Sequence, residues 1–554
     1  MPAPARLPIS CLLRVSARRS APASRKRTSP CLRCLERYAH ARQFSSTNAA
    51  YTSKDNSGKE SRISSGEKDI AKAQQQLYNS TTYKWPTSST VRRLLETTSD
   101  IGEGAEVNGW VQSIRKMKNV AFATVNDGST TQNIQVVLTP EQAKGLTIGT
   151  AAKIKGAWQG SLKEDAQRRE LLASNVEIVG ESDPATYPLQ KKSHTFEYLR
   201  SIPHLRPKSS TFKSLLSLRS AAMHHLTNFF YDRSFLQTHP PVLTSSDCEG
   251  AGEVFAVTQG DRKPFFKDPV YLTVSSQLHL EAQALASKNV WCLAPTFRAE
   301  KSDTARHLNE FYMLEAEMAF TDDVRQVTGL VEDMIRSLVE RLSNDRILTS
   351  DLFNRRMADG ELDGAVLEER WRNLIDGEWT TITYTDAVEV LRKAVTDKKK
   401  TFKFPVEWGV NLQSEHEKYL PEAVGNPHRP VFVTDYPAAI KPFYMLPNEA
   451  GEGQGGEIKK TVACFDLIFP QVGEIVGGSM REHRYEFLKR AMDEKGMNTE
   501  TKTQLSWYLE LRRWGCAPHG GFGLGFDRLL AYLAGMENIR ETVAFPRWYD
   551  RCLC

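Results

Sequence analysis

The sequence lacks the features by which several common classes of protein are recognised. Its 554 residues contain no run of about 18 apolar side chains, so a membrane-spanning helix is not predicted. No Gly-x-x-x-x-Gly-Lys-Ser/Thr segment occurs, which excludes a P-loop nucleotide site. Among the nine cysteines, Cys31 and Cys34 have the Cys-x-x-Cys spacing of a metal site, but no second pair accompanies them. We therefore expect reduced cysteines and no zinc site.

Acidic residues are almost absent from residues 1–46, which hold nine Arg and one Lys but a single acid, Glu36. Such an Arg-, Ser- and Ala-rich segment is typical of a mitochondrial transit peptide, although a disordered basic tail has a similar composition. The Arg-Gln-Phe-Ser sequence at residues 42–45 resembles a matrix-protease cleavage site. We predict a transit peptide over residues 1–46 and a polar linker over residues 47–90. The predicted destination is the mitochondrial matrix, and an additional cytosolic pool stays open.

The remainder of the chain has little excess charge of either sign. Without residues 1–46 it carries 63 basic and 66 acidic side chains. A surface that is basic throughout and coats nucleic acid is therefore excluded, and any polyanion must bind at a local patch. The content of 40% apolar and 25% charged residues is ordinary for a globular protein, and the length suits about two or three domains.

Residues 91–185 contain short runs in which apolar and polar side chains alternate between glycine-containing turns. The runs are residues 106–114, 120–126, 133–138, 151–158 and 175–179. This pattern predicts a small β-sandwich or an OB-fold barrel. Arg115, Lys116 and Lys118 lie near Phe122, a combination that suits single-stranded nucleic acid, because phosphates attract cations and bases stack on aromatic rings. A solvated turn beside a buried Phe122 explains the same residues.

Residues 186–206 are a predicted hinge, and residues 207–554 have the length of one large catalytic domain. Apolar residues at helical spacing predict a helix over residues 209–232. Residues 310–320 alternate and predict a strand, with five apolar side chains on one face. The other face carries Phe311, Met313, Glu315 and Glu317. Two carboxylates within a strand need partners or water, so this face is either a pocket floor or a half-solvated sheet face.

Two later segments combine strand-like runs with carboxylates or glycines. Asp466 lies in the apolar run 462–468, and Glu474 begins the next run. Two carboxylates on neighbouring strands offer the oxygen ligands that Mg²⁺ prefers, although this spacing alone is a weak signal. Glycine then occupies every second position at Gly521, Gly523 and Gly525, just before an apolar helix. A strand face without side chains lets a planar ligand or another backbone approach closely.

Three segments, in this order, resemble the three motifs of the class II aminoacyl-tRNA synthetases. They are the helix that leads from Ser209 to Pro241, the residues 297–300 and 306–311, and the residues 521–528. With the OB-like domain, the chain from about residue 100 onward resembles subclass b, which charges Asp, Asn and Lys. The segments 246–253, 273–278, 306–308, 440–445 and 473–479 are similar to those of the asparaginyl-tRNA synthetases. The resemblance implies an α+β fold, an antiparallel sheet flanked by helices and preceded by an OB-fold barrel.

The resemblance also implies an ATP site on the sheet. Arg298 and Arg528 are the implied catalytic residues: Arg298 binds the α-phosphate and the acyl carboxylate, and Arg528 caps adenine and reaches the γ-phosphate. Phe311 stacks on the other face of adenine. The further implied ATP contacts are Glu300, Arg306 and His307. Asp466 and Glu474 are the implied ligands of Mg²⁺.

A pocket for the amino acid is implied beside the ATP site. Its implied contacts are Glu249, Ser275, Gln277, Glu315 and Arg481, and residues 246–253 close over it as a lid. Glu315 accepts hydrogen bonds from the side-chain amide of Asn but repels the carboxylate of Asp. The aspartyl enzymes place a lysine where this chain has Leu280, preceded by His279. Met480 departs from the family pattern, which has Gln at this position. Since the neighbouring Arg481 is kept, we expect this change to adjust the amino-acid pocket rather than to abolish it.

The implied substrates are tRNA(Asn), ATP and L-asparagine, joined through an asparaginyl-adenylate for mitochondrial translation. Phe122 and Gln135 are implied to contact the anticodon. The helix over residues 209–232 and Pro241 are implied to form a homodimer interface. Two alternatives remain, an aspartyl-tRNA synthetase on the same scaffold and a non-catalytic RNA-binding paralogue. The presence of both Arg298 and Arg528 favours an enzyme.

We predict that residues 1–50 direct a fused reporter protein into the mitochondrial matrix, because this segment is basic and almost free of acids. Cell fractionation checks the destination. N-terminal sequencing of the imported protein should find the mature end at Ser45 or a few residues beyond it. A reporter that stays in the cytosol would show that the segment is only a basic tail.

Overall fold

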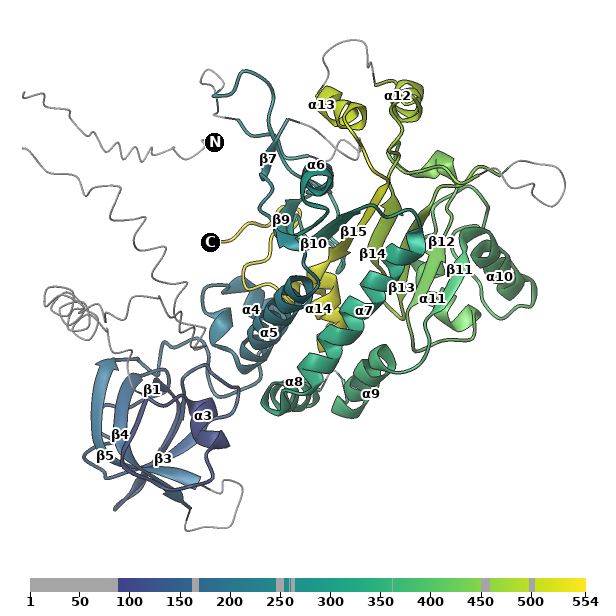
Figure 1. Cartoon of the computed structure of the whole chain (residues 1–554). Helices are drawn as coiled ribbons and strands as arrows, with labels where there is room; N and C mark the ends of the chain where they lie inside the picture. The colour runs from purple at the N-terminus through teal and green to yellow at the C-terminus, as the bar shows by residue number, and fades with distance from the viewer. Residues whose placement is uncertain are drawn as a thin grey trace, which may run out of the picture. The chain divides into compact units, whose positions relative to one another are not determined.

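The computed structural model describes residues 88–161, 169–245, 254–258, 260, 265–360, 362–449, 459–497 and 504–554 (Figure 1). The predicted transit peptide and the predicted lid over residues 246–253, which includes Glu249, lie outside the described residues. None of the helices in the described part of the chain combines the length and the apolar character that crossing a bilayer requires.

The first domain is a closed five-stranded barrel (Figure 1). Its strands are β1 (Ile101–Lys116), β2 (Ala121–Asn126), β3 (Ile134–Leu138), β4 (Ala151–Gly160) and β5 (Arg169–Gly180), hydrogen-bonded in the order β1-β2-β3-β5-β4. Alternation along β1 buries Val107 and Val111 in the barrel core, whereas Trp110 between them is 43% exposed. The short helix α3 (Val91–Glu96) adds Val91 and Leu94 to this core. Of the two predicted all-β folds, the barrel is confirmed.

The second domain is built on an eight-stranded sheet. In spatial order its strands are β11 (Thr380–Thr383), β12 (Val431–Thr434), β13 (Cys464–Phe469), β14 (Gly473–Met480), β15 (His519–Gly525), β10 (Glu310–Ala319), β9 (Asn289–Phe297) and β6 (Leu236–Gln237). The central pairs are antiparallel, and the two outermost pairs, β11–β12 and β9–β6, are parallel. Strands β7 (Leu243–Thr244) and β8 (Tyr271–Leu272) form a separate ribbon. The predicted α+β class is confirmed.

Helices cover one face of this sheet. The helices α5 (Ser210–Asp232), α7 (Val324–Ser343) and α14 (Phe526–Ala534) share an apolar core with the sheet, together with α8 (Arg346–Ala358) and α9 (Gly364–Ile375) (Figure 1). The other helices are α4 (Phe196–Ser201), α6 (Gln277–Ser287), α10 (Tyr384–Thr396), α11 (Ser414–Ala423), α12 (Tyr485–Glu494) and α13 (Ser506–Glu510). Helix α5 begins where the sequence predicts, because Ser209 is its N-cap and accepts a hydrogen bond from the backbone N–H of Phe212.

Strand β10 separates the apolar core beneath α5, α7 and α14 from the opposite face of the sheet, as its alternation predicts. Leu314 and Ala316 are buried in the core, whereas Glu315 and Glu317 lie on the other face. The neighbouring strand β15 contributes Phe522 and Leu524 to the same core. Gly521, Gly523 and Gly525 therefore lie on the opposite face, where Gly521 and Gly523 are the register partners of Glu317 and Glu315.

The glycines of β15 make room for side chains of β10. Gly521 is the register partner of Glu317, and a Cβ at Gly521 would lie 2.0 Å from Glu317 Oε2 and 2.3 Å from the carbonyl oxygen of Ala316. The same atom at Gly525 would come no closer than 3.5 Å to Arg528 Cδ. At Gly521, the space without a side chain is thus occupied by the carboxylate of Glu317.

We expect Gly521→Ala to lower the free energy of unfolding by about 3 kcal/mol or more, because the added methyl group collides with backbone as well as with Glu317. Gly525→Ala is the matched control and should unfold like the unaltered protein, since its methyl group makes only ordinary contacts. Denaturant-induced unfolding of the two variants checks this. Equal stability of both would show that the strand spacing relaxes around Gly521.

Candidate active site

Segments far apart in the sequence meet in one pocket beside β10. The six residues to which the resemblance assigns ATP contacts all line it: Arg298, Glu300, Arg306, His307, Phe311 and Arg528. Glu474 of β14 and the glycines Gly523 and Gly525 of β15 line the same pocket. The fold therefore gathers these side chains in one place, although their individual roles remain predictions.

Positive side chains dominate this pocket. The guanidinium of Arg298 lies 5.7 Å from the ring centroid of Phe311. Arg528 donates from Nη1 to the main-chain oxygen of Glu474 at 3.3 Å, and burial lowers the pKa of its guanidinium. His307 Nε2 lies 3.1 Å from Glu300 Oε2, and this hydrogen bond lowers the pKa of Glu300. A sheltered surface with several cations favours a polyanion such as a triphosphate.

The two predicted metal ligands lie on paired strands, Asp466 on β13 and Glu474 on β14. A Cβ at Gly477 would lie 3.2 Å from Glu474 Oε1 and 3.4 Å from Asp466 Oδ1, so both carboxylates border the space that this glycine leaves open. Burial, followed by the charges of Asp466 and Glu417, raises the pKa of Glu474 to about 7. Two carboxylates that face one space offer the oxygen ligands that a divalent cation such as Mg²⁺ prefers.

A lysine competes for one of these carboxylates. Lys441 Nζ donates to both oxygens of Asp466, at 2.9 and 3.1 Å, and lies 3.9 Å from the ring centroid of Tyr436. A third acid, Glu417, pairs with Arg306 at 3.7 Å. Asp466 is therefore already paired with a protein cation.

Glu315 lies further along the same face of β10 and is 3% exposed. Its Oε1 accepts a hydrogen bond from the hydroxyl of Ser275, and its Oε2 accepts one from the backbone N–H of Ser276 at 2.8 Å. Burial raises the pKa of the Glu315 carboxyl. The hydrogen bonds from Ser275 and Ser276, followed by the charge of Arg298, act on it in the opposite direction.

Arg481 is paired with Glu317. Its Nε and Nη2 donate to Oε1 and Oε2 of Glu317 at 3.1 and 3.0 Å, which is a bidentate ion pair. Both side chains are almost completely buried. Because Glu317 is two residues beyond Glu315 on the strand, this pair lies about 7 Å further along β10. The pocket contains an arginine whose charge is already balanced by a neighbouring carboxylate.

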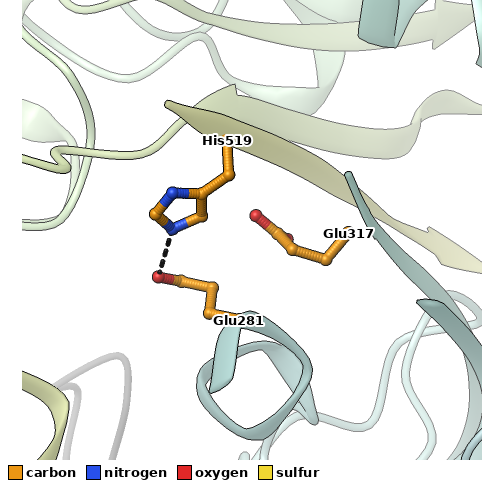
Figure 2. Close-up of side chains that lie close together, drawn as sticks. All are labelled: Glu281, Glu317 and His519. Carbon is orange, nitrogen blue, oxygen red and sulfur yellow. Dashed lines mark hydrogen bonds and ion pairs between the residues drawn. The ribbon is translucent and has the colours of Figure 1, made fainter. Parts of the chain in front are cut away.

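Glu281, Glu317 and His519 lie close together in a buried charged cluster, which Gln277 contacts through Glu281 (Figure 2). Glu281, on α6, accepts hydrogen bonds from Gln277 Nε2 at 3.0 Å and from the Tyr508 hydroxyl and Arg512 Nη2 at 2.7 Å each. His519, at the start of β15, lies with its Nε2 3.1 Å from Glu281 Oε2 (Figure 2). The side chains of Glu281, Arg512 and His519 are inaccessible to solvent.

Residues His279, Leu280 and Met480, which bear on the choice between Asn and Asp, place no additional cation at these three positions. Burial lowers the pKa of His279, and its ring lies 5.4 Å from that of Trp507, so it is a neutral packing residue. Leu280 is buried. Met480 packs into the helix-covered core, so its departure from the family pattern removes no side chain from the pocket.

The two predicted anticodon contacts share the outer surface of the barrel. Phe122 on β2 and Gln135 on β3 alternate with buried core residues, and Gln135 donates to Glu170 at 3.0 Å. Arg115, the register partner of Phe122 on β1, is exposed. Pro241, the predicted interface residue, is exposed as well.

The structure adds residues that the sequence analysis did not assign to a site: Glu281, Glu317, Glu417, Lys441, Tyr508, Arg512 and His519. For two of them, the local spacing in the sequence could have indicated a place near the predicted site. Glu281 lies one helical turn beyond Gln277, and Glu317 shares the strand face of Glu315. The others come from distant segments, and no spacing in the sequence indicates their contacts.

The chain is similar to proteins of known activity over most of its length. Residues 197–549 match the family model of class II tRNA synthetases (D, K and N), and residues 105–179 match that of the OB-fold nucleic acid binding domain. An asparagine--tRNA ligase of Nostoc sp. is 43% identical over 468 residues, which cover 80% of this chain and 95% of that protein. A mitochondrial asparagine--tRNA ligase of Schizosaccharomyces pombe is 44% identical over 461 residues, which cover 80% and 94%.

A solved structure supports the same relationship. The asparaginyl-tRNA synthetase of Pyrococcus horikoshii, complexed with asparaginyl-adenylate, is similar to this chain with a TM-score of 0.71 and 26% identity. The similarity covers 84% of this chain and 99% of that one. The two family matches, the identity to whole ligases and the shared fold agree, and the chain belongs to the asparagine--tRNA ligases among the class II aminoacyl-tRNA synthetases.

Proposed function

We propose that this chain attaches asparagine to tRNA(Asn) in two steps, with asparaginyl-adenylate as the intermediate. The observation that carries this proposal is the order of side chains along one face of β10. The cationic pocket at Phe311 is followed on the same strand face by Glu315 and by the pair of Glu317 and Arg481. This order suits ATP at one end and an amino acid at the other. The ligases of Nostoc and Schizosaccharomyces pombe, and the Pyrococcus enzyme with its adenylate, support the same reaction.

In the first step, a carboxylate oxygen of asparagine attacks the α-phosphorus of ATP, and pyrophosphate leaves. The substrate is itself the nucleophile, so catalysis comes from positioning and from cations that match the charge on the phosphates. Arg298 holds the α-phosphate and the carboxylate, Phe311 stacks on adenine, and Arg528 covers adenine and reaches the γ-phosphate. The further phosphate contacts come from Glu300, Arg306 and His307. In the second step, a terminal ribose hydroxyl of the tRNA attacks the acyl carbon, and AMP leaves.

Asp466 and Glu474 would hold Mg²⁺ at the phosphate end of this surface. When bound, the ion neutralises negative charge on the phosphates. Glu474 is the more available of the two ligands, because Lys441 already donates to both oxygens of Asp466. Arg306 and Arg528 line the same pocket and would contact the phosphates beside the ion.

The preference for asparagine over aspartate follows from the charge balance of the pocket. Ser275, Gln277, Glu315 and Arg481 contact the amino acid, and Glu249 contributes from the lid. Arg481 donates to the side-chain oxygen of the ligand, while Glu315 accepts from the amide nitrogen. With aspartate, Glu315 would face a second acceptor and a second negative charge. Because Glu317 already balances the charge of Arg481, this arginine offers little compensation for the repulsion between Glu315 and a second carboxylate.

Three further proposals concern partners and location. The barrel binds the anticodon through Phe122 and Gln135. The outer side of α5 and Pro241 form a homodimer interface. The enzyme works in the mitochondrial matrix, as the basic N-terminal segment and the mitochondrial relative in Schizosaccharomyces pombe suggest.

Amino-acid-dependent exchange between ATP and pyrophosphate tests the proposed substrate. We expect exchange with asparagine and a kcat/KM for aspartate that is lower by about a hundredfold or more. Glu315→Gln should erode this preference, because an amide at this position donates to a carboxylate. Glu310→Gln, at an exposed position of the same strand, is the control and should keep the preference. Comparable exchange with both amino acids in the unaltered protein would favour the aspartyl alternative. Exchange with neither would favour a non-catalytic paralogue.

Phe122→Ala should weaken tRNA binding without affecting adenylate formation. A base stacked on an aromatic ring contributes about 1–3 kcal/mol, so the KM for tRNA(Asn) should rise by roughly tenfold to a hundredfold. The exchange of pyrophosphate, which needs no tRNA, should be unchanged. Equal loss in both assays would mean that Phe122 only supports the barrel.

Sedimentation of the unaltered protein tests the homodimer, and a monomer at micromolar concentration would refute the interface.

A further inference from the structure

Three buried side chains behind the amino-acid pocket have the arrangement of a metal site. Ligand atoms of Glu281, Glu317 and His519 all lie within 4.8 Å of one another (Figure 2). They come from α6, β10 and β15, three elements that enclose the pocket. None of the three side chains is accessible to solvent. A cluster of this kind holds a metal ion, or its charges are compensated by the protein itself.

The protein itself already occupies the carboxylate oxygens. Glu281 Oε2 faces Arg512, Tyr508 and His519, and Glu281 Oε1 accepts from Gln277 Nε2 at 3.0 Å. The two oxygens of Glu317 accept from Arg481. A metal ion would have to displace these donors and would bring two further positive charges beside two guanidinium groups. The donor set therefore favours compensation by the protein.

The surroundings of His519 determine its charge. Its Nδ1 lies 2.8 Å from the main-chain oxygen of Ala517, which can only accept a hydrogen bond. Its Nε2 lies 3.1 Å from the carboxylate of Glu281, which is also an acceptor when ionised. An imidazole satisfies two acceptors only when both nitrogens carry a proton. His519 is therefore an imidazolium.

The cluster reaches the amino-acid pocket through Gln277. Glu281 lies one turn beyond Gln277 on α6 and accepts from its amide nitrogen. An amide side chain has a donor end and an acceptor end, and it can rotate to exchange them. An ionised Glu281 accepts only, so it fixes the nitrogen of Gln277 toward the cluster and leaves Oε1 as an acceptor. That oxygen is suited to the ammonium group of an amino acid.

We propose that His519 and Glu281 are positioning residues of the amino-acid pocket. Arg512 and the protonated ring of His519 together keep Glu281 ionised and in place, and Glu281 fixes the amide of Gln277 in the orientation that binds the ammonium group of asparagine. This role rests on the proposed activation of asparagine. Neither residue contacts ATP, so the proposal separates the binding of the amino acid from the binding of the nucleotide.

The proton on His519 gives the proposal a pH dependence. Burial alone lowers the pKa of His519, but hydrogen bonds with Cys516 and Glu281 outweigh it and raise the pKa to about 9. Its surroundings also include the charges of Glu317, Arg481, Arg512 and His483 and the hydroxyl of Tyr508. The pKa of His519 in the folded protein lies above its ordinary value of 6.5, so the protonated ring stabilises the folded arrangement. This contribution is complete below about pH 6.5 and is lost as the pH rises through about 9.

The test measures pyrophosphate exchange while asparagine and ATP are varied separately. His519→Gln and Glu281→Gln should each raise the KM for asparagine by about tenfold or more and leave the KM for ATP unchanged. Glu281→Asp keeps the acceptor and should recover part of the loss. Ser287→Ala, at the exposed end of α6, is the control. An unchanged KM for asparagine in both Gln variants would overturn the proposal, as would an equal rise for both substrates.

Two measurements on the unaltered protein keep the proposal testable if the variants do not fold. The KM for asparagine should rise between about pH 8 and 10 by more than the titration of the free amino acid explains, while the KM for ATP stays constant. A pH profile without this excess would overturn the proposal. Elemental analysis should find no stoichiometric metal, and a tightly held metal at this cluster would overturn it as well. Absence of asparagine-dependent exchange in the unaltered protein would instead refute the proposed function.

Discussion

The buried ion pair of Arg481 and Glu317 is the interaction on which the rest of the proposed amino-acid pocket depends. A carboxylate inside a sheet loses its hydration, and removing one member of a buried pair typically costs about 3–5 kcal/mol. The pair also needs space, which Gly521 supplies on the neighbouring strand. The glycine pattern of β15, the alternation of β10 and the arginine after β14 are therefore parts of one arrangement. In this arrangement Arg481 can donate hydrogen bonds to a ligand while Glu317 balances its positive charge.

This balance distinguishes the two ends of the surface along β10. At the nucleotide end, Arg298, Arg306 and Arg528 line one pocket, which suits a triphosphate. At the other end, Arg481 is matched by Glu317, and the added carboxylate Glu315 is held by Ser275 and by the backbone of Ser276. A ligand with a neutral side chain fits this second end better than a charged one does. In the proposed reaction, the same strand thus organises strong electrostatic binding of ATP and selection of a neutral amide.

Much of this arrangement could be predicted from the sequence, because it depends on local periodicity or on motif resemblance. Strand parity placed Phe311 and Glu315 on one face, and helical spacing located α5. The partners of the carboxylates could not be predicted in this way. Glu281 and His519 are 238 residues apart, and Lys441 and Asp466 come from different segments. Such contacts arise from the packing of strands and helices, which no local pattern encodes. The buried cluster behind Gln277 therefore emerges only from the three-dimensional structure.

A crystal structure with a non-hydrolysable analogue of asparaginyl-adenylate tests the central claim most directly. The charge-balanced pocket predicts that the side-chain amide nitrogen of the ligand faces Glu315, that its oxygen faces Arg481, and that the bidentate pair of Arg481 and Glu317 stays intact. The claim would be contradicted if Glu317 left Arg481 to bind the ligand, or if the amide of the ligand contacted neither Glu315 nor Arg481.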